Sequence, residues 1–262
     1  MKFRMFTERF ASELRELGLH TLEGVKSASG TPVKDHKGQR DISTFVIGSN
    51  SRLYLKRYWK SYKKDALAAL LRHGEVRSPA RREWENLKRL EISGFQVAPL
   101  VACGEECGLF WDRFSFIITE SAPGISLPHW LKNTADGESR KMLLLELSQW
   151  IRRFHEAGFS SPDLMAKHLF VHTKADEFAG YSFSLFDIAR LDSGKPTFTR
   201  RVRDLAVLNL SIARNLLAKE ERDFFLAEYA KGQNPSFFSL LETRMARLLK
   251  RRKYGKLWNA DS

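Results

Sequence analysis

The chain has 262 residues, of which 43% are hydrophobic and 19 are Phe, and its formal net charge is +13. This composition suits one large domain or two small lobes with a sizeable core, and it excludes a disordered chain. No run of 18 apolar residues occurs, and the charged start is not typical of a secretory signal, so we expect neither a membrane-spanning helix nor export. The excess of positive charge favours an acidic partner: a phosphate-rich ligand, an anionic membrane surface or nucleic acid.

The first half of the chain is predicted to be rich in strands. The spacing of Phe3, Phe6, Phe10, Leu14 and Leu17 predicts an amphipathic helix within residues 1–20. The other predicted elements are a β-hairpin over 41–58, a helix over 79–90 capped by Ser78, and strands over 97–104 and 109–121. Cys103 and Cys107 are too widely spaced for a C-x-x-C motif, and we expect free thiols in a reducing cytoplasm.

The second half is predicted to be mostly helical. A segment rich in Pro and Gly, residues 122–130, marks a domain boundary near residue 121. A strong helix over 141–158 ends at Gly158, two short β-like runs follow at 168–172 and 181–187, and a helical pattern resumes at Val202. We therefore predict a β-rich lobe with one main helix over residues 1–120 and a helical lobe over 121–262.

Two residues of the first half suit phosphoryl transfer from ATP, which needs a cation on the phosphates. Lys56 lies in an alternating strand, LYLKRY, and could point its ammonium group at a nucleotide; a solvated surface lysine is the alternative. Glu83 shares a helix face with Leu87 and Leu90, so it could pair with Lys56. Glu85 is the rival, and a surface role for Glu83 stays open.

Two acids of the second half could supply the remaining chemistry. Asp163, in SPDLMAKHLF, follows a helix end and lies on a loop, where catalytic groups are commonly placed; a helix N-cap is the alternative. Asp187, in FSLFDIAR, ends an apolar strand and could bind Mg²⁺, which prefers oxygen ligands; an ordinary turn is the alternative.

Three stretches, FHEAGFSSPDLMAKHLFV, SFSLFDIARL and RDLAVLNLS, resemble the lipopolysaccharide core kinase family, the heptose and Kdo kinases with their InaA-type relatives. The resemblance spans roughly residues 40–215. It implies an α+β, bilobal protein-kinase-like fold and the use of ATP and Mg²⁺. It also implies that Asp163 is the catalytic base, that Asp187 binds Mg²⁺, that Lys56 binds phosphate with Glu83 as its partner, and that Asp204 braces the acid loop by hydrogen bonds.

The acid loop departs from the protein-kinase pattern at two positions. Ser161 replaces a histidine that normally packs under the loop, which raises the question of how rigid the loop is. His168 replaces a metal-binding asparagine, and we interpret it as a contact to phosphate or metal, with a core histidine as the alternative. Arg190 could hold a phosphate or a substrate anion, or form an ordinary salt bridge.

The nucleotide-binding part lacks a glycine-rich G-x-G-x-x-G loop. We expect the segment KDHKGQRDIS to replace it, with Gly38 and Arg40 near the phosphates. By position, Glu120 and Ala122 are expected to meet adenine through their backbone.

Two basic regions suit an acidic glycolipid. Near the C-terminus, Lys250–Lys253 with Tyr254 and Trp258 fit an anionic membrane surface, although a helix packed on the helical lobe is favoured for the apolar residues of this segment. The second region comprises Lys60, Lys63, Lys64, Arg72, Arg77, Arg81 and Arg82.

The sequence as a whole predicts an ATP- and Mg²⁺-dependent kinase for a sugar hydroxyl of the lipopolysaccharide core or a similar acidic glycolipid. We expect it in the cytoplasm, with a peripheral contact to the inner membrane. A protein kinase and a pseudokinase used as a binding module are the alternatives. A nucleic-acid binder ranks last, because no RNA-reading motif occurs.

Overall fold

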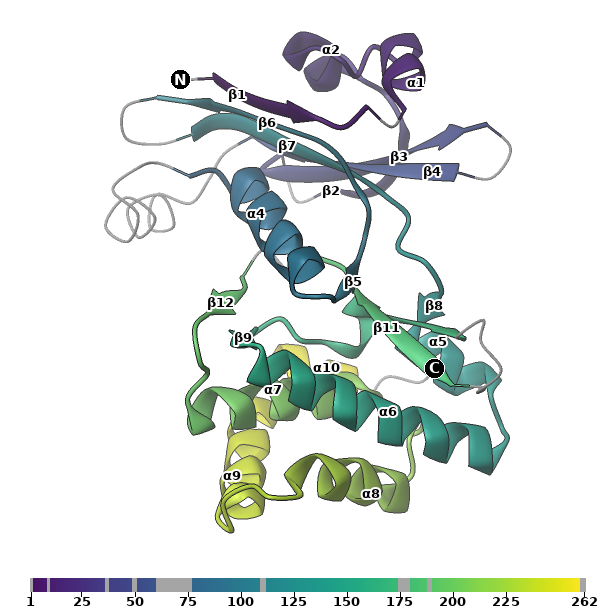
Figure 1. Cartoon of the computed structure of the whole chain (residues 1–262), viewed down its shortest axis with the longest axis vertical. Helices are drawn as coiled ribbons and strands as arrows, with labels where there is room; N and C mark the ends of the chain where they lie inside the picture. Colours follow the sequence, from purple (N-terminus) through teal and green to yellow (C-terminus); the bar gives the residue numbers. More distant parts are fainter. Residues whose placement is uncertain are drawn as a thin grey trace. The chain divides into compact units, whose positions relative to one another are not determined.

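A computed structural model describes residues 2–8, 10–35, 38–48, 51–59, 77–108, 112–173, 180–187 and 190–259. It divides into two compact units, one of Met1–Ile92 with Val97–Ala122 and one of Ser93–Gln96 with Pro123–Ser262. The first is rich in strands and the second is mostly helical, as Figure 1 shows, which confirms the predicted α+β class.

The first unit is built on a six-stranded antiparallel sheet in the order β1-β6-β7-β4-β3-β2. The predicted hairpin is present, with Ile47 paired to Ser51 across the turn. The strands are β1 (Lys2–Phe6), β2 (Thr31–Asp35), β3 (Arg40–Ile47), β4 (Ser51–Tyr58), β6 (Leu100–Cys107) and β7 (Asp112–Glu120).

The predicted N-terminal helix is wrong for its first residues. Strand β1 pairs with β6, and only α1 (Ala11–Glu16) and α2 (Leu22–Ser27) are helical. Pairing with β6 satisfies the backbone of an otherwise open sheet edge, and this long-range gain overrides the helical spacing of the aromatic residues. The two helices and the turn between them bury Leu14, Leu19, Leu22 and Val25 against the sheet.

Helix α4 (Pro79–Ile92) packs on the other face of the same sheet, against β6, β7 and β4 (Figure 1). The Ser78 hydroxyl accepts a hydrogen bond from the Arg81 backbone N–H at 3.1 Å, so the predicted cap is confirmed. The buried face carries Trp84, Leu87 and Leu90 together with one carboxylate, that of Glu83.

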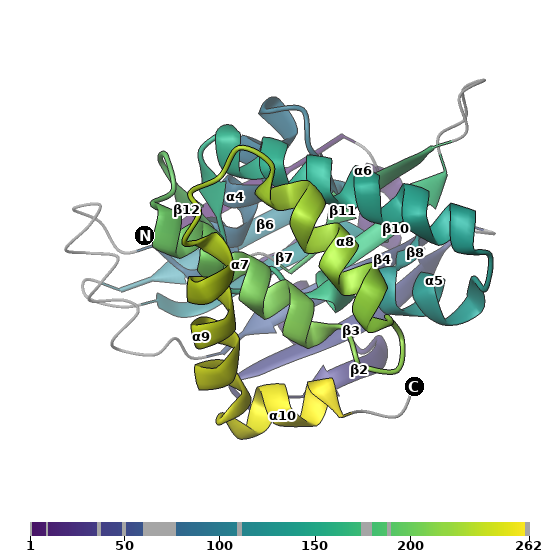
Figure 2. The ribbon, with the colours of Figure 1, turned by 90° about the horizontal axis from the view of Figure 1, so that it is seen from below.

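The second unit contains the long helix α6 (Gly137–Glu156), which begins before the predicted residue 141 because the Asp136 carboxylate accepts the Ser139 backbone N–H at 2.9 Å. Figure 2 shows α8 beside α6 and α9 beside α7, in agreement with their contacts. The other helices are α5 (Leu127–Asn133), the 3₁₀-helix η1 (Ala166–His168), α7 (Phe198–Ser211), α8 (Lys219–Ala230), α9 (Phe237–Leu249) and α10 (Arg252–Trp258).

Two small sheets complete this unit. One has the order β5-β11-β10-β8 and the other pairs β12 with β9. Their strands are β5 (Gln96–Val97), β8 (Ile125–Ser126), β9 (Phe159–Ser160), β10 (Leu169–Thr173), β11 (Tyr181–Leu185) and β12 (Asp192–Ser193).

Both cysteines are buried thiols outside any disulfide, and the thiol state is the one predicted from the sequence. Burial raises the pKa of both thiols, that of Cys107 to about 12, so neither is a ready nucleophile. Within the described residues, none of the helices has both the length and the apolar character needed to cross a bilayer.

Candidate active site

Lys56 and Glu83 form a buried ion pair inside the first unit. Their Nζ and Oε1 atoms lie 2.7 Å apart, and each residue is 1% exposed. The Tyr58 hydroxyl donates to the other carboxylate oxygen of Glu83 at 3.0 Å. The rival, Glu85, instead pairs with Arg77 at 2.8 Å and with Arg81 at 3.0 Å.

This pair holds the Lys56 ammonium group in place. Central strand β4 supplies the lysine and the inner face of α4 supplies the glutamate, so both side chains are fixed by their elements. Since removing one member of a buried pair leaves an uncompensated charge, the arrangement is strongly specified. The structure thus excludes the solvated-surface interpretations of Lys56 and Glu83.

The segment expected to replace the glycine-rich loop lies at the β2–β3 hairpin. Gly38 has a φ of 71°, a left-handed value that favours glycine, and its N–H donates to the Asp35 carboxylate at 3.2 Å. Arg40 opens β3 and its guanidinium lies 5.9 Å from the centre of the Tyr58 ring. A tight turn followed by a strand arginine suits the covering of phosphates, although the Gly38 N–H is already used.

Glu120 and Ala122 lie where β7 leaves the sheet. The Glu120 backbone N–H donates to the Pro99 carbonyl at 2.9 Å, so this residue can offer adenine only its carbonyl. The Ala122 N–H has no backbone partner among the residues that the structure describes. A carbonyl and an N–H two residues apart match the donor and acceptor on one edge of adenine.

In the second unit, the β10–β11 pairing brings together the sequence-predicted residues His168 and Asp187. Leu169 of β10 lies opposite Leu185 of β11, and the Phe186 N–H donates to the His168 carbonyl at 2.9 Å. His168 Nε2 therefore lies 3.8 Å from Asp187 Oδ2. Asp187 has a φ of 57°, an uncommon conformation for a residue with a side chain and one that clusters at functional sites.

The hydrogen bond of His168 defines its tautomer. Nδ1 lies 3.0 Å from the Asp163 carbonyl, which can only accept, so Nδ1 carries the proton. Burial lowers the pKa of His168, and the neutral ring then presents a lone pair on Nε2 toward Asp187. His168 is thus buried, as its alternative as a core histidine expects, and its Nε2 faces Asp187; the contact to phosphate or metal stays a prediction.

Asp163 and Arg190 form a two-point ion pair on the same unit. Arg190 Nε donates to Asp163 Oδ2 at 2.6 Å, and Arg190 Nη2 pairs with the other oxygen. The Asp163 side chain is 17% exposed and that of Arg190 is 64% exposed. Asp163 caps no α-helix, because only η1 follows and its cap residue is Met165, so the N-cap alternative is wrong.

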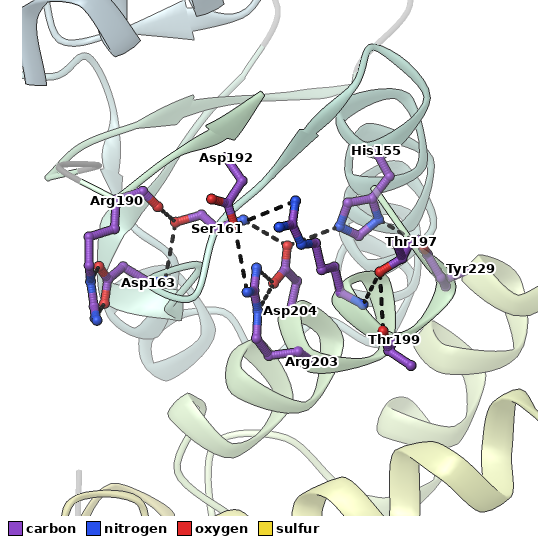
Figure 3. A network of polar contacts seen from close by, with 11 residues as sticks. His155, Ser161, Asp163, Arg190, Asp192, Thr197, Thr199, Arg203, Asp204 and Tyr229 are labelled. Carbon is purple, nitrogen blue, oxygen red and sulfur yellow. Dashed lines mark hydrogen bonds and ion pairs between the residues drawn. The ribbon is translucent and has the colours of Figure 1, made fainter. Parts of the chain in front are cut away.

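Ser161 braces the acid loop in place of the missing histidine. Its hydroxyl accepts from the Asp163 N–H at 3.1 Å and donates to the Arg190 carbonyl at 2.9 Å, while its N–H donates to Asp204 at 2.7 Å, as Figure 3 shows. The predicted bracing role of Asp204 is confirmed. Because all three bonds are buried or half-buried, the loop is held without a histidine at position 161.

His155, Tyr229 and Arg203 extend this brace and were not predicted from the sequence. His155 Nδ1 lies 2.7 Å from the Tyr229 hydroxyl and Nε2 lies 3.4 Å from Asp204, while Arg203 Nε donates to Asp204 at 2.8 Å (Figure 3). A carboxylate only accepts, so Nε2 carries the proton and Tyr229 donates to Nδ1. The only sequence signal was a histidine on the apolar side of α6, which does not reveal its partners.

A family model for the "Lipopolysaccharide kinase (Kdo/WaaP) family" matches residues 23–229. The chain belongs to this family. The resemblance predicted from the sequence is confirmed, and the chain is a kinase of the lipopolysaccharide kinase family.

The lipopolysaccharide kinase of Pseudomonas aeruginosa named "Lipopolysaccharide core heptose(I) kinase WaaP" is 26% identical over 260 residues, which covers 92% of this chain and 94% of that protein. An Escherichia coli protein of the same name is 28% identical over 230 residues, 83% of each chain. A solved structure, "WaaP in complex with acyl carrier protein", has a TM-score of 0.64 and 22% identity over 98% of this chain and 99% of that one. This likeness confirms the predicted fold class.

The two predicted basic regions of this lipopolysaccharide kinase differ in outcome. In the first unit, Arg77 and Arg81 are engaged by Glu85, and Arg81 also lies 3.3 Å from Glu105. The other predicted residues of this region, Lys60, Lys63, Lys64 and Arg72, lie outside the described residues.

At the C-terminus, the apolar residues Phe237, Leu241 and Leu248 are buried, as expected for a helix that packs on α7, whereas Leu249 is exposed. Tyr254 is buried and the Arg222 guanidinium covers the Trp258 ring at 4.4 Å. These aromatic residues therefore pack inward, contrary to the expectation that they contact a membrane.

Proposed function

We propose that this kinase transfers the γ-phosphoryl group of ATP to a sugar hydroxyl of the lipopolysaccharide core, a heptose hydroxyl being favoured by the names of its curated relatives. The observation that carries the proposal is a braced acid, Asp163, beside an Asp187–His168 site in the second unit of a chain whose residues 23–229 match the family model. The two predicted lobes, residues 1–120 and 121–262, would serve the nucleotide and the acceptor respectively.

The first unit would bind the nucleotide. Lys56, fixed by Glu83, would place its ammonium group on the phosphates, as the strand lysine does in protein kinases. Gly38 and Arg40 would cover the phosphates from the β2–β3 hairpin. The Glu120 carbonyl and the Ala122 N–H would bind the adenine edge.

The residues of the second unit fit a magnesium site. Mg²⁺ is usually held by one or two carboxylates together with substrate phosphates and water, and Asp187 supplies one carboxylate with 22% of its side chain exposed. His168 would contact the same site through Nε2, although nitrogen is a weaker ligand for Mg²⁺ than oxygen. The bound ion would neutralise charge on the phosphates.

Asp163 would act as the base. The attacking sugar oxygen forms the new bond to the γ-phosphorus, the bond to ADP breaks, and the hydroxyl proton passes to a carboxylate oxygen of Asp163. Arg190 uses one lone pair on each oxygen, so either oxygen can still accept the sugar hydroxyl. The guanidinium would then lie next to the transferred group, where its charge would stabilise the phosphoryl oxygens.

The acceptor would be an acidic glycolipid, met at the cytoplasmic face of the inner membrane. Lys250–Lys253 are four exposed cations in a row that lead into α10. Each basic residue near an anionic leaflet contributes about 1 kcal/mol to binding. Peripheral contact would thus depend on charge and not on the two aromatic residues that pack inward.

Labelled ATP tests the function. The protein is incubated with Mg²⁺, γ-labelled ATP and lipopolysaccharide extracted from a strain that lacks core phosphate, and the position of the new phosphate is found by mass spectrometry of the released sugars. We expect labelled heptose and no labelled protein. Label on a peptide acceptor would favour a protein kinase, and nucleotide binding without transfer to any acceptor would favour a pseudokinase.

A further inference from the structure

A basic groove lies between α7 and α9 of the second unit, apart from the residues assigned above to catalysis. It has a volume of about 330 Å³. None of its lining residues is acidic; they are Thr199, Arg200, Val202, Arg203, Leu240, Thr243, Arg244 and Arg247. Four guanidinium groups around one small cavity point to an anionic ligand.

The four arginines are only partly neutralised by neighbouring acids. Arg200 and Arg203 share Asp192, at 4.0 Å and 3.7 Å, and Arg203 is also bonded to Asp204. Arg244 and Arg247 form no ion pair with any residue in the described ranges. Four arginines with two acidic partners leave the groove with an excess of about two positive charges.

Arg244 also has a donor available for a ligand. It is half-buried, and its Nε is a buried donor without a hydrogen-bond partner. An unsatisfied buried donor is costly, so one is usually explained by a missing ligand or a functional role. A phosphate or carboxylate oxygen would satisfy it, because guanidinium forks match such groups.

The groove lies close to the acid loop. Arg203, which lines it, donates to Asp204, and Asp204 accepts the N–H of Ser161, two residues before Asp163 (Figure 3). Tyr254 also lies near both the acid loop and the groove. Burial is the main cause of the raised pKa of its hydroxyl, the charge of Asp163 raises this pKa further, and the charge of Arg244 lowers it. A substrate that offers a hydroxyl to Asp163 could therefore place a nearby anionic group in the groove.

We propose that the α7–α9 groove binds a phosphate or carboxylate group of the acceptor's core saccharide and so positions the acceptor for phosphorylation. This inference rests on the proposed function and adds the part of the substrate that is recognised. The acceptor is held at two points, its hydroxyl at Asp163 and its anion at Arg244 and Arg247.

The test compares three full-length proteins: wild type, R244Q/R247Q, and the control R89Q/R113Q. The control removes two arginines that are exposed and form no ion pair among the described residues, so the change in net charge is the same. The probe is de-O-acylated lipopolysaccharide. Its binding is measured by calorimetry without ATP, and its KM and that of ATP are measured in turnover.

We expect R244Q/R247Q to weaken binding of the probe and to raise its KM at least tenfold, with the KM for ATP changed less than twofold and the control like wild type. The difference between wild type and variant should shrink at high salt, because salt screens exposed charges. Equal binding by variant and wild type, or no binding by wild type, overturns the groove assignment. Loss of binding to phosphatidylglycerol vesicles without loss of binding to the probe also overturns it, in favour of a membrane site.

These results separate the two proposals. If wild type binds the probe through the groove but transfers no phosphate, the proposed function fails and the groove stands. If wild type phosphorylates the probe and R244Q/R247Q does so with an unchanged KM, the groove fails and the function stands. A Tm within about 2 °C of wild type shows that R244Q/R247Q is folded. The variant R244K/R247K keeps the charge but loses the guanidinium fork, so its affinity for the probe should lie between those of wild type and R244Q/R247Q.

Discussion

Arg190 holds the carboxylate of Asp163 through both oxygens. Such two-point pairs are specific in geometry, and here the arginine backbone is fixed as well, because its carbonyl accepts the Ser161 hydroxyl at 2.9 Å. The proposed base is thus already oriented, and the guanidinium that would stabilise the transferred phosphoryl group is ion-paired with it. The salt bridge of Arg190 is thus present in the structure, and its contact to phosphate stays a prediction.

Replacing Arg190 by Gln should therefore lower kcat while leaving the affinity for ATP nearly unchanged. Both the orientation of Asp163 and the stabilising charge are lost, and we expect a fall of about tenfold to a thousandfold. Arg190→Lys, which keeps the charge but not the fork, should recover only part of the rate. Steady-state kinetics with lipopolysaccharide check this, and a kcat within twofold of wild type for Arg190→Gln would remove Arg190 from the mechanism.

The buried Lys56–Glu83 pair gives a prediction on stability and on nucleotide binding. Lys56→Met leaves the Glu83 carboxylate buried with Tyr58 as its one remaining partner among the described residues, and should lower the free energy of unfolding by about 3–5 kcal/mol. Lys56→Met/Glu83→Leu should be more stable than the single variant, because the orphaned charge is gone. The single variant and the double variant should both lose ATP binding, because both lack the Lys56 ammonium group.

The matched control for this pair is Glu85→Gln on the same helix. The carboxylate is partly exposed and pairs with Arg77 and Arg81, so its loss should cost only about 0–1 kcal/mol and leave ATP binding intact. Denaturant unfolding and nucleotide titration supply both readings. If the single and double Lys56 variants are equally stable, the two groups are not coupled.

Ser161 gives a prediction on the brace. Ser161→Ala removes one accepted and one donated hydrogen bond and should cost about 1–3 kcal/mol, which corresponds to a shift in Tm of several degrees. Because those bonds hold the Asp163 loop, kcat should fall while the KM for ATP stays the same.

Ser148→Ala is the control for Ser161→Ala. It separates an effect on the position of the Asp163 loop from a general loss of stability. Ser148 is also buried and donates to the Leu145 carbonyl at 2.7 Å, but it lies in α6 away from the acid loop. We expect a modest loss of stability and an unchanged kcat. A Ser148 variant as slow as the Ser161 variant would show that general loosening, and not the brace, lowers the rate.

His155 gives a prediction on pH. Burial lowers its pKa in the folded protein, against the influence of Asp204, so the folded state keeps a neutral ring. In the unfolded chain the ring takes up a proton near pH 6.5. Above about pH 6.5 both states are neutral and the contribution is constant; as the pH falls below it, the unfolded chain binds more protons and the free energy of unfolding falls.

Urea unfolding at pH 7 and at pH 5.5 measures this effect. His155→Gln should show a smaller loss of stability between the two values than wild type, but not zero, because burial also lowers the pKa of His168 and His172. His20→Gln, a change at an exposed position, should lose as much as wild type. An identical loss in all three proteins would mean that His155 is not neutral in the folded state.

The sequence predicted the elements that have a local signature. The Ser78–Pro79 helix start, the β3–β4 hairpin and the bracing by Asp204 were predicted, because a cap, a turn or a recognised motif encodes each of them. The pairing of Glu83 rather than Glu85 with Lys56 followed from helix periodicity, since only one of two neighbouring acids can share the face of Leu87.

The features that depend on long-range partners could not be predicted. Residues 2–6 have helical spacing but join the sheet because β6 offers an open edge. The network of His155 with Tyr229 and Asp204 joins residues 49 and 74 positions apart, and no local pattern records such contacts. The same is true of Ser161, whose sequence position suggested a weakened loop although its three hydrogen bonds show a braced one.

The rate of phosphate transfer by Asp163→Asn tests the central claim most directly. The variant keeps the shape of the side chain but cannot act as a base, and the exposed acid Asp223, which pairs with Lys219, supplies the control Asp223→Asn. With labelled ATP, Mg²⁺ and lipopolysaccharide, we expect Asp163→Asn to lose at least about a hundredfold in kcat, to bind ATP like wild type, and Asp223→Asn to remain fully active. Turnover by Asp163→Asn at the wild-type rate would contradict the assignment of Asp163 as the catalytic base.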